Sequence, residues 1–193
     1  MTILCQMNSV GFKAKPTSIQ FYGKLREKMI QRGWVNLDED EFVRKVTNEG
    51  YSFYGNIFDG HDLMELGQQR LCWRAQTMVG VDIDHALVDP LDIIQEYHRI
   101  GLTPWLVYGT FSDGELIRSF RLLWKVEVDL NRTYEEWKAV IKELNAVVGT
   151  LGDKHAQDCT RMWQGSDRGV IYRNPLAKKV PYAEFIETLG LQQ

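Results

Sequence analysis

A short stretch near the middle of the chain, "MVGVDIDHA", joins a continuous apolar run to two acidic residues. The apolar residues favour a β-strand, in which successive side chains point to opposite faces. Asp82 and Asp84 then share one face, about 6.6 Å apart along the strand, while Val81 and Ile83 point to the other. The chain must therefore fold so that one strand buries an apolar face and holds two carboxylates together on the opposite face.

The closeness of Asp82 and Asp84 requires a compensating environment. Two neighbouring carboxylates repel each other, and each raises the pKa of the other unless a cation or open solvent relieves the repulsion. Hard oxygen ligands suit Mg²⁺ or Mn²⁺, which bind carboxylates together with substrate phosphates. The pattern favours a site for one of these ions, and two solvated acids at the end of a strand are the alternative.

A second acidic stretch, "GDKHAQDCTR", contains Asp153, Asp158 and Arg161. A third carboxylate would complete a metal site that leaves positions open for phosphate oxygens, as in phosphoryl or nucleotidyl transfer. Spacing alone does not choose between Asp153 and Asp158, and Asp158 also fits the N-cap of a short turn.

Two basic residues, Arg121 and Lys125, lie within the apolar segment "SFRLLWKVEV". They are four residues apart, so on a strand both share a face with Leu123. A guanidinium can bind phosphate oxygens through two parallel hydrogen bonds. Both residues are candidates for contacting a triphosphate, and the apolar residue between them indicates that one of the two is a solvated edge charge.

Strand and helix signals alternate along the chain. Apolar spacing, caps and the capping-box pattern of Thr133 with Glu136 predict helices over residues 18–31, 38–48, 90–101, 134–148 and 182–193. β-Branched and aromatic residues predict strands over residues 51–58, 70–84, 103–111 and 117–130. The turn "SDGE" lets the last two strands pair antiparallel. This order predicts an α+β fold, with a mixed or antiparallel sheet flanked by helices.

Composition limits the function classes. With 193 residues and a net charge of −3, the chain is expected to form one domain and not a diffuse polyelectrolyte. Three widely spaced cysteines do not form a disulfide framework, which favours a reducing, cytoplasmic location. No run of 18 apolar residues occurs, so we expect no membrane association.

From about residue 70 to residue 168, the order of these motifs resembles the catalytic domain of the archaeo-eukaryotic primase superfamily, especially the primase-polymerases of phages and plasmids. The similar features are the strand ending in D-x-D ("VGVDID"), a serine and a basic residue in an apolar run (Ser112 and "SFRLLW"), and the acidic turn "GDKHAQDCTR". Each motif is short, so the resemblance depends on their order.

The resemblance implies an RRM-like sheet flanked by helices, in a single catalytic domain over residues 1–193. Residues 1–70 would form an N-terminal αβ unit that helps to hold the template, and residues 71–193 would form the catalytic sheet and helices. Similar domains are fused to helicases or DNA-binding tails, so the chain is compatible with being one part of a longer protein. A helicase or other replication protein is then an expected partner.

The resemblance also implies a reaction and its residues. Asp82, Asp84 and Asp153 would hold two Mg²⁺ or Mn²⁺ ions, while a 3′-hydroxyl attacks the α-phosphate of a nucleoside triphosphate on a single-stranded DNA template. Ser112, Arg121 and Arg161 are the nucleotide-binding residues that the resemblance implies, although Arg121 stands where many members have a histidine, and Lys125 joins them as a candidate from its charge and its place on the same strand face.

A haloacid-dehalogenase-like phosphatase is the main alternative, because its motifs also include D-x-D and G-D-x-x-x-D. In that case Asp82 would be the nucleophile and Asp84 the general acid. Against it stand Ala86, where that family favours Thr or Val, and the helical pattern before Asp153, where the phosphatase needs an apolar strand. A non-catalytic nucleic-acid-binding replication module is a third possibility.

Overall fold

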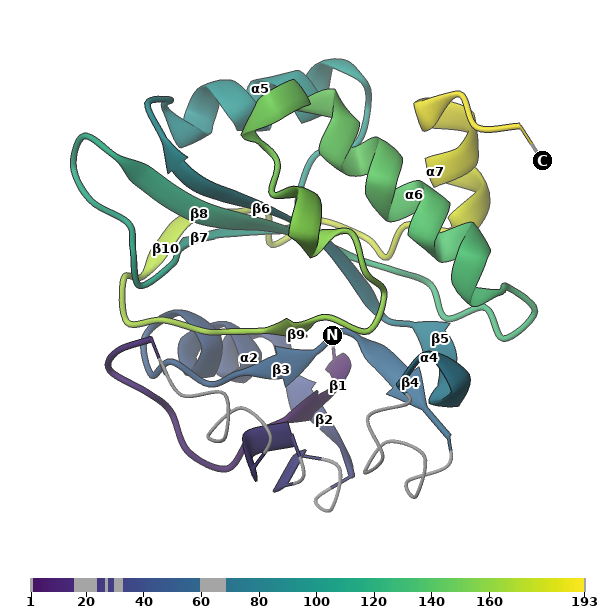
Figure 1. Cartoon of the computed structure of the whole chain (residues 1–193), viewed down its shortest axis with the longest axis horizontal. Helices are drawn as coiled ribbons and strands as arrows, with labels where there is room; N and C mark the ends of the chain where they lie inside the picture. The colour runs from purple at the N-terminus through teal and green to yellow at the C-terminus, as the bar shows by residue number, and fades with distance from the viewer. Residues whose placement is uncertain (1, 16–23, 27, 30–32, 60–68, 193) are drawn as a thin grey trace.

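The computed structural model describes residues 2–15, 24–26, 28–29, 33–59 and 69–192. Within them the chain forms antiparallel sheets flanked by helices, which confirms the predicted α+β class (Figure 1). The helix predicted over residues 18–31 lies largely outside the described residues. None of the helices in the described part of the chain is both long and apolar enough to cross a bilayer.

The sheet that carries the aspartates has the strand order β10-β7-β8-β6, with antiparallel pairing throughout. Its strands are β6 (Met78–Ala86), β7 (Leu106–Gly109), β8 (Arg118–Lys125) and β10 (Val170–Arg173). β7 and β8 form the predicted hairpin, in which Leu106 pairs with Leu123. The pairing of β6, at the edge of this sheet, with β8 sets Asp82 opposite Arg121.

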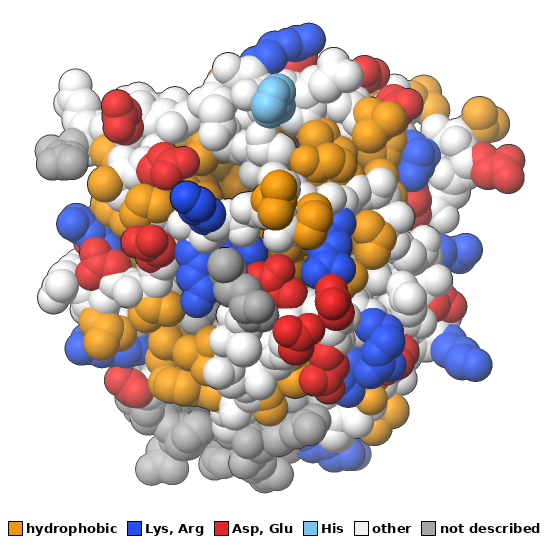
Figure 2. Space-filling model, turned by 180° about the vertical axis from the view of Figure 1, so that it is seen from behind, with side chains coloured by type: hydrophobic (Ala, Val, Ile, Leu, Met, Phe, Trp, Pro, Cys, Tyr) orange, Lys and Arg blue, Asp and Glu red, His pale blue; other side chains and the backbone are white. Residues whose placement is uncertain are grey.

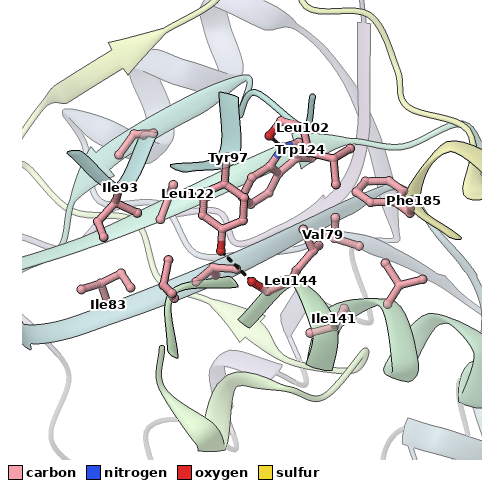
Figure 3. Packing of buried hydrophobic residues seen from close by; sticks show 14 of the residues in the cluster. Val79, Ile83, Ile93, Tyr97, Leu102, Leu122, Trp124, Ile141, Leu144 and Phe185 are labelled. Carbon is pink, nitrogen blue, oxygen red and sulfur yellow. Dashed lines mark hydrogen bonds between the residues drawn. The ribbon is translucent and has the colours of Figure 1, made fainter. Parts of the chain in front are cut away.

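Three helices cover one face of this sheet (Figure 1). They are α5 (Pro90–Arg99), α6 (Tyr134–Val147) and α7 (Tyr182–Leu189), and the predicted capping box of Thr133 and Glu136 begins α6. The apolar side chains of β6 and β8 pack against these helices (Figure 3). Two polar groups inside this core are satisfied locally, since the Tyr97 hydroxyl donates to the Leu144 carbonyl at 2.7 Å and the Trp124 indole donates to the Leu102 carbonyl at 2.8 Å. The helices thus bury one face of the sheet, and the site lies on the opposite face.

A second four-stranded sheet has the order β2-β1-β3-β9, and of its strands only β3 lies within a predicted strand, that of residues 51–58. It contains β1 (Thr2–Met7), β2 (Trp34–Asp38), β3 (Phe53–Tyr54) and β9 (Met162–Trp163), with α2 (Glu39–Thr47) alongside. A two-stranded sheet of β4 (Asn56–Phe58) and β5 (Trp73–Gln76) follows, and α4 (Gln69–Cys72) precedes β5. Because β9 comes from the C-terminal half of the chain, it ties the two halves together.

The second core lies between the two four-stranded sheets. It includes Met78 of β6, Leu123 of β8 and Trp163 of β9, together with side chains of β1 and α2. β1 escaped prediction because four of its six residues, Ile3, Cys5, Gln6 and Met7, are buried, so its sequence lacks the polar–apolar alternation that marks a half-exposed strand. β9 has only two residues, which is too short for a periodic signal.

Candidate metal centre

The side chains of β6 alternate as the sequence predicted. Val79, Val81 and Ile83 are fully buried under the helices, while Asp82 and Asp84 lie on the opposite face. Asp82 is only 2% exposed, whereas Asp84 reaches the surface. The strand therefore carries one carboxylate deep inside the protein and a second at the mouth of a pocket.

The strand is irregular immediately after Asp84. The register of β6 with β8 shifts between Ile83 and Ala86, and His85 adopts a φ of 55°, which is uncommon for a residue other than glycine. The His85 backbone N–H donates to the Ser119 hydroxyl at 3.0 Å, which holds the bulge in place. Bulges of this kind redirect neighbouring side chains and recur beside active sites. Ser119 is a residue of the site that sequence reasoning missed.

Asp82 has one occupied and one unoccupied oxygen. Oδ2 accepts from Arg121 Nη2 at 2.7 Å and from Arg161 Nη2 at 3.2 Å. Oδ1 is buried and, among the described residues, has no hydrogen-bond partner. A buried carboxylate oxygen without a partner is costly, and a hard divalent cation is a ligand that would satisfy it.

Asp153, and not Asp158, lies beside the two aspartates. Ligand atoms of Asp82, Asp84 and Asp153 lie within 4.8 Å of one another. The Asp153 backbone N–H donates to the Asp82 carbonyl at 2.9 Å, which docks this turn onto β6. Asp153 also accepts from the His155 N–H at 2.8 Å through Oδ1 and so caps the short 3₁₀ helix Lys154–Ala156. Three oxygen donors at this separation fit a divalent cation.

Asp158 is engaged elsewhere. Its carboxylate accepts from the Thr160 backbone N–H at 2.7 Å and from the Tyr134 hydroxyl at 2.9 Å. Burial opposes its negative charge, but these hydrogen bonds outweigh that effect and lower the pKa of Asp158. The structure therefore bears out the capping role proposed for this residue as the alternative to metal binding.

Arg121 is held rigidly behind Asp82. Its Nη1 donates to the Tyr108 hydroxyl at 2.9 Å and to the Gln164 carbonyl at 2.6 Å. Its guanidinium also lies 4.7 Å from the Trp163 ring centroid and 5.6 Å from that of Tyr108. Burial acts against the charge, yet Asp82 and Tyr108 overcome it and raise the pKa of Arg121 above its usual value. Arg121 lines the pocket, but its terminal nitrogens are already used by the protein.

Arg161 is less constrained than Arg121. Its side chain is 28% exposed, against 6% for Arg121. Nη2 bridges Asp82 and Asp153, at 3.2 and 3.4 Å, and Nη1 donates to the His155 carbonyl at 2.9 Å. Arg161 therefore places a positive charge among the three carboxylates from the solvent side.

The surroundings of Asp84 act on its pKa in opposite directions. Burial and the neighbouring Asp82 raise its pKa, Arg121 and Lys15 act in the opposite direction, and the net effect is a raised pKa. Lys15, from the N-terminal segment, is a second residue that sequence reasoning missed. No local signal marks it, because only the tertiary fold brings that segment to the strand.

Asp82 and Asp84 border a pocket whose other wall comes from the hairpin between β7 and β8 and from the segment around β9, while Asp153 lines an adjoining hollow that Asp84 shares. The further lining residues of the pocket include Lys15, Thr110, Phe111, Ser112, Met162 and Gln164. Predicted Ser112 therefore lies in the same pocket as Asp82, Asp84, Arg121 and Arg161. The pocket combines oxygen ligands for a cation with hydroxyl, ammonium and guanidinium groups that suit phosphate.

Lys125, predicted to bind the nucleotide, is not brought to this pocket. It is 1% exposed and its Nζ lies 2.7 Å from the Glu39 carboxylate of α2, with the Trp105 ring beneath it. The register explains the difference: Lys125 pairs with Met78 at the far end of β6, whereas Arg121 pairs with Asp82. Lys125 joins the sheet to α2, and we correct its predicted role accordingly.

Charge on the face shown in Figure 2 is mixed. Figure 2 shows the face behind that of Figure 1, where Lys and Arg side chains are interspersed with Asp and Glu. No broad field of one sign covers this face, in agreement with the net charge of −3.

The stretch before Asp153 bears on the phosphatase alternative. Residues 134–147 form α6 and residues 149–151 a 3₁₀ turn, so the apolar strand that the phosphatase requires there is replaced by helix. The sheet also pairs β6 antiparallel with its neighbour β8.

Comparison with known proteins yields one informative similarity. No protein-family model and no curated protein matches the chain. Among solved structures, the AEP domain of the cyanophage S-2L primase-polymerase (PrimPol) is similar, with 11% sequence identity and a TM-score of 0.50. The match covers 97% of this chain and 89% of that domain. At this identity the similarity concerns the fold, and it agrees with the predicted fold class.

Proposed function

We propose that the protein is a metal-dependent nucleotidyltransferase of the primase-polymerase type, acting on nucleoside triphosphates with single-stranded DNA as template. The observation that carries the proposal is the convergence of Asp82, Asp84 and Asp153, whose ligand atoms lie within 4.8 Å of one another. Asp82 and Asp84 border a pocket that also contains Lys15, Ser112 and Arg161, and Asp153 lies beside them at its edge. The fold similarity to a primase-polymerase domain supports the same reading.

Each residue has a defined part in this proposal. Asp82, Asp84 and Asp153 would bind Mg²⁺ or Mn²⁺ through carboxylate oxygens. Bound there, a divalent cation would favour ionisation of the attacking 3′-hydroxyl and neutralise charge on the α-phosphate. Ser112 would donate a hydrogen bond to the triphosphate, and Lys15 and Arg161 would bind its negative oxygens. Arg121 would fix the orientation of Asp82 through their 2.7 Å ion pair.

The reaction joins the 3′-oxygen of a primer, or of an initiating nucleotide, to the α-phosphorus. The bond from the α-phosphorus to the oxygen that bridges to the β-phosphate breaks, pyrophosphate leaves, and the hydroxyl proton passes to solvent. A helicase or another replication protein is proposed as a partner, because similar domains are fused to such proteins.

The decisive experiment is extension or initiation of chains on single-stranded DNA with Mg²⁺ or Mn²⁺, using ribo- and deoxyribonucleoside triphosphates separately. We expect activity from the wild type and a large loss in Asp82→Asn and Asp84→Asn. Asp158→Asn is the matched control, because this acid lies in the same region but is bound to Thr160 and Tyr134. Circular dichroism would check that each variant is folded.

Other outcomes separate the alternatives. Equal activity of the wild type and Asp82→Asn would refute the proposal. Metal-dependent release of phosphate from a generic phosphoester without polymerisation would favour the phosphatase. Binding of single-stranded DNA with neither activity would identify a non-catalytic module.

A further inference from the structure

We propose that Asp82 coordinates a single divalent ion, through Oδ1 alone, and that Arg121 permanently supplies the positive charge that a second ion would bring to Oδ2. This inference rests on the proposed function and departs from the two-ion site that the sequence motifs imply. In a two-ion site the ions lie about 3.5–4 Å apart, and a carboxylate shared between them gives one oxygen to each.

The oxygen atoms of Asp82 are not equivalent. Oδ2 accepts from Arg121 Nη2 at 2.7 Å and from Arg161 Nη2 at 3.2 Å, so two guanidinium groups already lie against it. Oδ1 is buried and lacks a partner among the described residues. Since Asp82 is only 2% exposed, Oδ1 cannot be satisfied by bulk solvent, and it is the oxygen available to a cation.

Arg121 cannot easily make way for a second ion. It is 5% exposed, its Nη1 donates to Tyr108 and Gln164, and the Trp163 ring covers its guanidinium. Displacing it would break these contacts and leave a buried guanidinium without its counter-charge, which is strongly unfavourable. The neighbouring strands β6 and β8 also hold the backbones of Asp82 and Arg121 opposite each other.

Arg161 differs in this respect. It lies on the solvent side of the carboxylates with 28% of its side chain exposed, and its contacts with Asp82 and Asp153 are longer, at 3.2 and 3.4 Å. It can therefore turn towards a phosphate when a cation enters. Part of the charge on the leaving pyrophosphate would then be balanced by Arg161 and Lys15, both of which line the pocket.

The experiment counts the ions bound to Asp82. Crystals of the protein would be soaked with Mn²⁺ and an α,β-imido nucleoside triphosphate, which cannot react, and anomalous scattering would locate manganese. We expect one peak within coordination distance of Asp82, on the Oδ1 side and shared with Asp84 and Asp153. Two peaks on Asp82, one at each oxygen, would overturn the inference and leave the proposed function intact.

Solution measurements give an independent readout. Titration followed by the electron paramagnetic resonance of free Mn²⁺ should give one tightly bound ion per chain without nucleotide, and none in Asp82→Asn. Arg121→Lys, which keeps the positive charge, and Arg161→Gln, which removes the mobile guanidinium, should both keep the count at one. A count of two in Arg161→Gln would show that Arg161, and not Arg121, excludes the second ion. Absence of Mn²⁺ binding by the folded wild type would overturn both this inference and the metal site of the proposed function.

Discussion

Asp82 and Arg121 face each other across the antiparallel pair β6 and β8, and Arg121 Nη2 lies 2.7 Å from Asp82 Oδ2 in a pair with side chains only 3% and 6% exposed. A buried pair of this kind tolerates loss of both partners far better than loss of one, because a single survivor remains as an uncompensated charge. The pair therefore links the stability of the central sheet to the geometry of the site.

Removing Arg121 alone should be strongly destabilising. We expect Arg121→Met to lower the free energy of unfolding by about 3–5 kcal/mol at neutral pH, since buried Asp82 would lose its 2.7 Å partner and keep only the longer contact with Arg161. The double variant Asp82→Asn/Arg121→Met should recover a large part of this loss. Urea unfolding of the wild type, the two single variants and the double variant measures the coupling free energy between Asp82 and Arg121. If the losses of stability in the two single variants simply add up in the double variant, the pairing is contradicted.

Arg161 should compete with the metal ion. Because its guanidinium bridges Asp82 and Asp153, Arg161→Gln is expected to bind Mn²⁺ about 2–5-fold more tightly, as expected for the loss of a weak, partly exposed ion pair. The same variant should need more nucleotide for half-maximal activity. Isothermal titration with Mn²⁺ checks the first effect, and weaker metal binding would mean that Arg161 instead organises the carboxylates.

The bulge at His85 should control the placement of Asp84. A φ of 55° is accessible to glycine, whereas a β-branched side chain is strained there. We expect His85→Gly to retain Mn²⁺ affinity and His85→Val to lower both affinity and stability, the latter by about 1–2 kcal/mol. Calorimetric titration and thermal unfolding of both variants test this, and equal behaviour of the two would exclude a backbone role for this position.

The carboxylate of Asp158 should contribute to stability in a pH-dependent way. Its pKa in the folded protein is below its ordinary value of 3.8, so the folded state favours the ionised form. The contribution is therefore complete above pH 3.8 and disappears as the pH falls through the lower, folded-state pKa. Asp158→Asn should reduce the melting temperature more at pH 7 than at pH 3, and an equal reduction at both would show that the charge is not involved.

Much of the fold follows from local sequence signals. The capping box at Thr133, the proline that opens α5 and the alternation of β6 each depend on residues a few positions apart, and all three are present in the structure. Most of the second sheet escaped prediction, because the buried residues of β1 do not alternate regularly with polar ones and β9 has only two residues. These strands are defined by pairing between segments that are far apart in the chain, such as the pairing of Phe53 with Trp163.

The sequence by itself determined that Asp82 and Asp84 share one face of a strand, because the two-residue period of a β-strand leaves no other arrangement. Only the tertiary structure decided what surrounds them. The Asp153 N–H donates to the Asp82 carbonyl, which brings a third carboxylate to the site. The register of β8 places Arg121 opposite Asp82, whereas Lys125 forms an ion pair with Glu39. These choices depend on which strands pair and in what register, and packing of the complete chain fixes both.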